Sequence, residues 1–153
     1  MTKNSITSFK GEYAFLSNFW PCKIFYEGLE FDSVEAAYVA AKTTDMEIRK
    51  QIQALDSPGK CKRFGRIIEV RPRWDDMKIG IMIGLVEQKF SRHEDLRKML
   101  LSTGDAEIIE GNTWGDRFWG AEYNSATAEY EGKNLLGYIL MNTRYYVGCG
   151  SMD

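Results

Sequence analysis

Three residues of different chemistry recur at helical spacing in the alanine-rich stretch 32–42. Glu35, Tyr38 and Lys42 fall at positions i, i+3 and i+7, so on an α-helix they share one face. A partly buried carboxyl group there could serve as a general acid or base, and a lysine shielded from water could offer a neutral amine as a nucleophile. The structural alternative is that Glu35 only caps the helix and Lys42 is a solvated surface residue.

Local signals predict the elements that would position this face. A capping-box pattern from Asp32 to Glu35 predicts the helix start, and four alanines favour the helix. A β-hairpin is expected over residues 23–31, because Gly28 supplies the positive φ that a tight turn needs. A second capping box, Thr44 with Glu47, predicts the start of a helix that runs to about residue 55. The segment Ser57-Pro58-Gly59 should break this helix.

The second half of the chain predicts three more helices and a short strand. The 78–90 helix has an apolar stripe that we expect to face the core. Its residues are Ile79, Met82, Ile83, Val86 and Phe90. A capping box from Ser91 to Glu94 begins the next helix, which Gly104 ends. A strand is expected at 106–110, a loop at 121–132, and an amphipathic helix at 134–146.

Three irregular stretches carry candidate binding residues, each with a structural alternative. Residues 11–20 fit a strand end or structured loop, in which Ser17 and Asn18 form a turn or contact a ligand. Residues 60–74 are basic and end in Trp74, which suits either a solvated face or phosphate binding. Residues 111–120 hold three glycines with Trp114 and Trp119, so we expect either a ligand loop or a bulky packed corner.

Composition limits the function classes. A chain of 153 residues with no linker or repeat predicts one α+β domain, 1–153, mainly helical with a few short strands. A net charge of −2 argues against a large duplex nucleic-acid footprint, and no apolar run approaches a membrane span. Three scattered cysteines and a single histidine make a metal site or histidine triad unexpected and indicate a reducing, cytoplasmic setting.

In order along the chain, these motifs resemble those of the NADAR superfamily, also called YbiA-like proteins. The resemblance covers about residues 9–147, and its matching pieces are Phe15-Leu16-Ser17-Asn18-Phe19, Tyr26-Glu27-Gly28, Ser33-Val34-Glu35, Ala40-Ala41-Lys42, Trp74, Ser102-Thr103-Gly104-Asp105, Asn112-Thr113-Trp114-Gly115-Asp116, Phe118-Trp119-Gly120 and Gly132-Lys133-Asn134-Leu135-Leu136-Gly137. It implies the NADAR fold and N-glycosidase chemistry without a cofactor. Members of the family cleave early riboflavin intermediates or remove ADP-ribose from modified guanine. The residues that the motifs carry over are Glu35, Lys42, Trp74, Trp114, Asp116 and Asn134.

A mechanism follows as a hypothesis. Glu35 serves as general acid/base and Lys42 as the amine nucleophile that forms a Schiff base with the opened sugar. Asp116 holds ribose hydroxyls or orients Lys42. The expected substrate-binding residues are Asn18, Tyr38, Arg71, Trp74, Trp114, Trp119 and Asn134, with Arg63, Arg66 and Arg73 as further candidates for the phosphates.

Two departures from the family pattern bear on the substrate and the rate. The family has a histidine after the glutamate and a glutamine before Ala-x-Lys, where this chain has Ala36 and Val39. Two other functions therefore stay open: a module that binds ADP-ribose or another nucleotide without turnover, and a non-enzymatic interaction protein. The expected partners are a small nucleotide or an ADP-ribosylated base, with contact to modified nucleic acid as an option.

Overall fold

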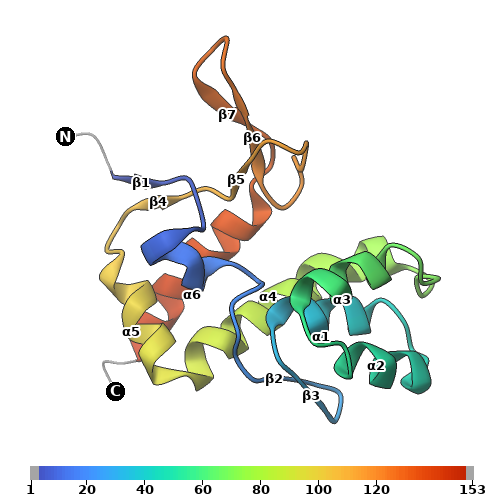
Figure 1. The fold of residues 1–153 in the computed structure, drawn as a ribbon. Helices are drawn as coiled ribbons and strands as arrows, with labels where there is room; N and C mark the ends of the chain where they lie inside the picture. Colours follow the sequence, from blue (N-terminus) through green and yellow to red (C-terminus); the bar gives the residue numbers. More distant parts are fainter. Residues whose placement is uncertain (1–3, 151–153) are drawn as a thin grey trace. The chain divides into compact units, whose positions relative to one another are not determined.

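The chain folds into two compact units, which are described separately. The structure, a computed structural model, describes residues 4–150. One unit comprises residues 18–89, and the other the segments before residue 18 and from residue 90 onward. The predicted α+β class, mainly helical with a few short strands, is confirmed (Figure 1). Among the described residues, no helix is long and apolar enough to cross a membrane.

Unit 18–89 begins with the predicted hairpin. Strands β2 (Ile24–Tyr26) and β3 (Leu29–Phe31) pair antiparallel. Both turn residues, Glu27 and Gly28, have positive φ, at 46° and 85°. This backbone matches the right-handed twist of the flanking strands. The hairpin leads directly into α1.

Helix α1 (Val34–Ala41) is the buried centre of this unit and packs against α2 (Met46–Gln53) and α3 (Pro58–Gly65). Its N-cap is Ser33, whose hydroxyl oxygen accepts a hydrogen bond from the backbone N–H of Ala36 at 3.1 Å. The predicted cap, Asp32, is wrong by one residue. Asp32 is exposed and instead pairs with Lys23 at 2.7 Å.

The caps of α2 and α3 also differ from the prediction. Asp45, not Thr44, accepts from the backbone at the start of α2. Ser57 and Pro58, predicted to break a helix, start α3: Ser57 is its N-cap, and Pro58 occupies the first turn, where its missing N–H is not needed. The predicted basic segment is therefore in large part a helix.

The predicted core face of the long helix α4 (Trp74–Arg92) is confirmed at Met82, Val86 and Phe90 and wrong at Ile79 and Ile83. Met82, Leu85 and Val86 are buried, whereas Ile79 and Ile83 are more than a third exposed. Lys89 near its end is buried. The helix also runs past Ser91, so the predicted capping box there is wrong.

In the other unit, α5 (Glu94–Ser102) and α6 (Leu135–Gly150) pack together, with the 3₁₀ helix η1 (Gly11–Leu16) replacing the predicted loop. Gly104, at φ 64°, ends α5 as predicted. Strand β1 (Ser5–Ile6) pairs parallel with β4 (Glu107–Ile108). The predicted loop 121–132 is wrong.

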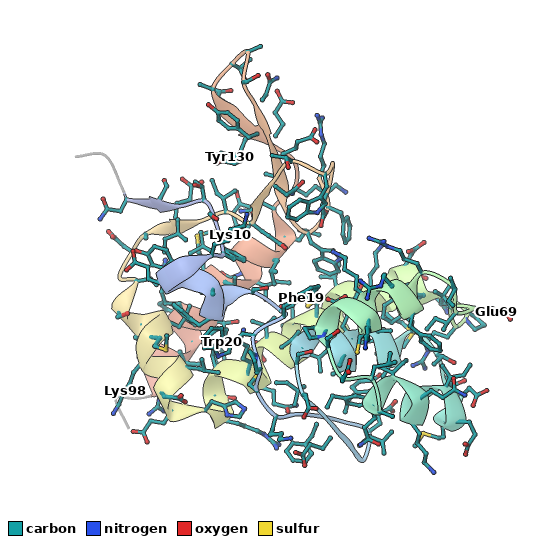
Figure 2. The ribbon with its side chains drawn as sticks, viewed as in Figure 1. Lys10, Phe19, Trp20, Glu69, Lys98 and Tyr130 are labelled. Atoms are coloured by element: carbon teal, nitrogen blue, oxygen red, sulfur yellow. The ribbon has the colours of Figure 1, made fainter. Side chains whose placement is uncertain are left out.

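That segment forms a hairpin instead. Strands β6 (Ala121–Asn124) and β7 (Glu129–Glu131) pair antiparallel, and β5 (Gly111–Asn112) pairs parallel with β6. Tyr123 and Tyr130 contact each other across it, with ring centroids 5.2 Å apart; Tyr130 is labelled in Figure 2. This cross-strand aromatic pair stabilises strands whose polar sequence alone did not predict a sheet.

Candidate active site

Helix α1 presents Glu35, Tyr38 and Lys42 along one face, as their spacing predicted. Because Ser33 performs the capping, Glu35 is not needed for it, and the capping alternative for this carboxyl group is wrong. The backbone N–H of Glu35 donates to the carbonyl oxygen of Asn18 at 3.0 Å, which holds the preceding loop against the start of the helix. The Glu35 side chain is half-buried.

Lys42 lies at the other end of the same helix, as its C-cap residue. Its side chain is half-buried, with Nζ 3.5 Å from the carbonyl oxygen of Gly65 and 5.8 Å from the ring centroid of Tyr38. Its backbone carbonyl accepts a hydrogen bond from Arg71 N–H at 2.7 Å. The amine therefore lies against α3 and is only partly exposed, unlike a fully solvated surface lysine.

The environment shifts the two titratable groups in opposite directions. Burial raises the pKa of Glu35, although the positive charges of Lys62, Lys42 and Arg66 oppose that rise. Burial lowers the pKa of Lys42; the charge of Glu35 opposes this, while Lys78, Arg66 and Lys62 lower the pKa further. Desolvation disfavours the charged form of both groups. The pair therefore tends toward a protonated acid and a neutral amine.

Three cations thus act on this face. Lys62 and Arg66 both lie in the basic segment 60–74, for which the sequence left phosphate binding open, although only Arg66 was named as a phosphate candidate. Lys78 lies outside that segment. Lys62 and Arg66 are four residues apart on α3, so they share a helix face. Had Ser57-Pro58 been interpreted as a helix start, that spacing would have indicated the pair. Lys78 has no comparable signal in the sequence.

Of the remaining predicted residues of this unit, some contact the site and others are exposed. Trp74 is buried and packs against Tyr38, with ring centroids 5.3 Å apart, so it extends the aromatic wall of the α1 face. Asn18 donates from its side-chain amide to the sulfur of Met82. The backbone N–H of Arg71 donates to the Lys42 carbonyl oxygen, and the Arg71 charge opposes the rise that burial causes in the pKa of Tyr26. Arg63 and Arg73 are exposed.

Asp116, Trp114, Trp119 and Asn134 belong to the other unit, and the structure assembles them around a loop. Asp116 Oδ1 accepts from the backbone N–H groups of Phe118 and Trp119, at 3.1 and 3.0 Å. Asn112 is buried and bonds both the N–H and the carbonyl of Asp116. Trp114 is 64% exposed. The loop is therefore ordered by side-chain amides, with one tryptophan presented to solvent.

Asn134 has a positioning role in this loop. It is buried, with φ at 51°; its Oδ1 accepts from Glu110 N–H and its Nδ2 donates to the Ile108 carbonyl, both at 2.9 Å. Both polar ends of the amide are thus engaged with the backbone. Gly137 lies so close to this amide that a Cβ there would collide with it. These contacts explain why a residue without a side chain stands three positions after Asn134.

The two departures from the family pattern are buried in apolar surroundings. Ala36 lies on the α2 side of α1. Val39 packs against Gly65, where an added Cβ would come within 3.0 Å of both Val39 methyl carbons. Within residues 4–150, no group of three His, Cys, Asp or Glu residues is arranged to hold a metal ion.

One face of α1 thus carries a half-buried carboxyl group and a partly desolvated amine, with cations and the tilted ring pair of Tyr38 and Trp74 beside them. The chain belongs to the NADAR family, because the NADAR domain model matches residues 7–147.

Similar proteins agree with this class. N-glycosidase YbiA of Escherichia coli K12 is 34% identical over 87% of this chain and 81% of its own length. The riboflavin biosynthesis protein VVA0006 of Vibrio vulnificus is 32% identical over 86% of this chain and 35% of its own length. The NMR structure of E. coli YbiA superimposes with a TM-score of 0.81 at 28% identity, covering 100% of this chain and 90% of that one. The chain is accordingly an enzyme, a hydrolase acting on N-glycosyl bonds.

Proposed function

We propose that the chain cleaves the bond between C1 of a ribosyl phosphate or ADP-ribose and a nitrogen of a base, with Lys42 as nucleophile and Glu35 as general acid and base. The observation that carries this proposal is the shared face of α1, on which burial raises the pKa of Glu35 and lowers that of Lys42. An acid that keeps its proton and an amine that loses it are the forms that the reaction needs.

The proposed reaction passes through a covalent imine between Lys42 and C1 of the sugar. The neutral amine of Lys42 attacks C1 of the sugar, the C1–N bond breaks, and the departing nitrogen takes the proton of the Glu35 carboxyl group. The Glu35 carboxylate then accepts a proton from the attached Lys42 nitrogen and passes it to the ring oxygen as the C1–O bond breaks, which opens the sugar to a protonated imine. Water hydrolyses the imine and restores the free amine.

The other groups bind and orient the substrate in this proposal. Lys62, Arg66 and Lys78 surround the reacting pair with positive charge, which suits a phosphate or diphosphate. Tyr38 and Trp74 supply aromatic faces near Lys42. The base is a riboflavin-type pyrimidine or a guanine, free or in nucleic acid; the name of the Vibrio relative favours the former.

The setting expected from the sequence, a reducing cytoplasm, is part of the proposal. Among the described residues, the thiols of Cys61 and Cys149 are free, which supports it.

Trapping the covalent intermediate tests the proposal directly. Purified protein is incubated with an ADP-ribosylated guanine in a short DNA, or with a phosphoribosylamino-pyrimidine, and reduced with borohydride. We expect free base from one substrate and a sugar adduct on the peptide containing Lys42. The matched control Lys50→Met, a change on the exposed side of α2, should leave the adduct intact, and Lys42→Met should abolish it.

Two results would refute parts of this scheme. Release of base by Lys42→Met at the wild-type rate removes the amine from the mechanism. If neither substrate is cleaved but ADP-ribose raises the melting temperature, the chain is a binder; the three cations around Lys42 are the feature that favours this second function.

A further inference from the structure

Two lysines lie beside the aromatic pair of Tyr38 and Trp74, one from α1 and one from α4. Lys42 follows Tyr38 by four residues, and Lys78 follows Trp74 by four residues. Because four residues make about one helical turn, each lysine lies on the same helix face as the ring that precedes it. The two rings contact each other, with centroids 5.3 Å apart. Their contact therefore brings both lysines into one cluster within unit 18–89.

The amine of Lys78 carries its charge in partly buried surroundings. The Lys78 side chain is 23% exposed, and its Nζ donates to Asp75 Oδ1 at 3.0 Å. Asp75 is 88% exposed, so water screens its carboxylate and the ion pair offsets little of the Lys78 charge. Lys42 Nζ is half-buried and lies 5.8 Å from the Tyr38 ring centroid. Two ammonium groups in such a cluster repel each other more strongly than they would in water.

The charges that act on Lys42 come from three helices. Burial is the largest cause of the lowered pKa of Lys42, and the charge of Glu35 on α1 opposes this change. Lys78 on α4 lowers the pKa further, and it does so more than Arg66 and Lys62 of α3. Lys78 is therefore the leading cation in the surroundings of the amine.

Lys78 also differs from the other two cations in the group on which it acts. Lys62 and Arg66 oppose the rise that burial causes in the pKa of Glu35, so they favour loss of the proton that the acid has to keep. Lys78 shifts Lys42 and not Glu35. Since Glu35 and Lys42 are about 10 Å apart along the axis of α1, a cation can be close to one of them and remote from the other.

We propose that Lys78 is a positioning residue for the N-glycosidase reaction, whose charge keeps the amine of Lys42 neutral without drawing the proton from Glu35. This inference rests on the proposed function, which makes Lys42 the nucleophile. A second cationic group next to a lysine is one of the ways in which enzymes activate an amine nucleophile. The effect operates in the free protein, before a substrate binds, and so it is separable from binding of a phosphate by Lys78.

Competitive labelling of the free protein tests this inference without a substrate. Trace acetic anhydride reacts with a lysine only in its neutral form, so the labelling of each lysine peptide as a function of pH reports when that amine loses its proton. Lys78→Met removes the charge and keeps a side chain of similar length. We expect labelling of Lys42 at neutral pH, relative to exposed Lys50, to fall about threefold or more, because loss of a neighbouring cation favours the protonated amine. The labelling profile of Lys42 should move to higher pH.

Further variants separate the charge of Lys78 from its packing. Because Lys78→Met can disturb the contacts of Trp74, Lys78→Arg provides a second test: it keeps the charge and should retain the wild-type labelling of Lys42. Asp75→Asn removes the exposed partner of Lys78 and leaves its charge in place, so labelling of Lys42 should stay at or above the wild-type level. The matched control Lys60→Met, at an exposed position of α3, should behave as wild type.

The selectivity of Lys78 is measured on Glu35, by NMR titration of its isotope-labelled carboxyl group. Lys62→Met should move the titration of Glu35 to higher pH, since the charge of Lys62 opposes the rise in its pKa. Lys78→Met should leave that titration unchanged, although the same substitution moves the labelling profile of Lys42.

Unchanged labelling of Lys42 in Lys78→Met overturns the inference, and weaker binding of ADP-ribose by that variant would then assign Lys78 to the phosphates. A Glu35 titration that moves equally in Lys78→Met and Lys62→Met also overturns it. The two proposals fail separately. A labelling shift in a protein that forms no adduct at Lys42 supports the role of Lys78 and refutes the proposed mechanism. Adduct formation with wild-type labelling of Lys42 in Lys78→Met does the reverse.

Discussion

Lys89 should make the stability of this protein rise with pH over a range where most proteins lose stability. The side chain is 1% exposed on α4, and burial lowers its pKa from the ordinary value of 10.5 to about 8, with the charge of Cys22 opposing the shift. Between these two values the unfolded chain holds a proton on Lys89 that the folded chain has released. Since the unfolded state binds more protons there, the free energy of unfolding increases with pH.

The size of this effect follows from the pKa change. Each pKa unit corresponds to about 1.4 kcal/mol, so burying the charged lysine costs the fold about 3 kcal/mol at pH 7. Most of that cost is relieved by pH 10, which gives a gain of about 2.5 kcal/mol over this range. Lys89→Met keeps a side chain of similar length without the titrating group, so it should lack this gain.

Urea denaturation at pH 7, 8, 9 and 10 under reducing conditions measures the gain as the difference between wild type and Lys89→Met. Taking the difference cancels the groups that both proteins share. The exposed Lys50→Met should follow wild type at every pH. If wild type and Lys89→Met change in parallel from pH 7 to 10, Lys89 is not titrating as its burial requires and the reasoning is refuted.

Other predictions concern the site. Ser33→Ala should lower the free energy of unfolding by about 1 kcal/mol while Asp32→Ala leaves it nearly unchanged, because only Ser33 caps α1; equal losses in urea denaturation would contradict this. Gly65→Ala should lower the free energy of unfolding by about 1 to 3 kcal/mol, because the new Cβ would push α3 away from Val39. Circular dichroism melts measure this loss; an unchanged melting temperature would show that the α1–α3 contact relaxes freely. Asn134→Ala leaves two backbone groups unpaired and should cost about 2 to 4 kcal/mol; a loss below 1 kcal/mol would show that water replaces the amide. For catalysis, kcat/KM should have a bell-shaped pH profile, because the amine of Lys42 gains a proton as pH falls and the acid of Glu35 loses one as pH rises; a pH profile of Glu35→Gln that keeps the high-pH fall would exclude Glu35 as its cause.

Features that depend on neighbouring residues were predictable from the sequence. The Glu27-Gly28 hairpin and the end of α5 at Gly104 both follow from positive φ angles that few residues tolerate. The shared face of Glu35, Tyr38 and Lys42 follows from the helical period alone. The sequence also indicated the fold class and the family motifs.

Choices between adjacent, equally suitable residues were not predictable. Asp32 and Ser33 are both good caps, as are Thr44 and Asp45. Which of them caps depends on where the preceding hairpin or turn leaves the backbone, and this placement is tertiary. Ser57-Pro58 likewise suits a helix end or a helix start. Only packing of α3 against α1, through the contact of Gly65 with Val39, favours the start.

The chemistry of the site was determined only by the tertiary structure. Sequence spacing brings Glu35 and Lys42 to one face, but their pKa shifts arise from burial and from cations on α3 and α4. Charges so far apart in sequence act on one another only after the chain folds. The same reason accounts for the exposure of Ile79 and the burial of Lys89, because a helical period gives the faces of α4 and not which neighbours cover them. The sequence alone thus determined the residue types of the candidate site and their spacing, and the fold decided the directions of their pKa shifts and their surroundings.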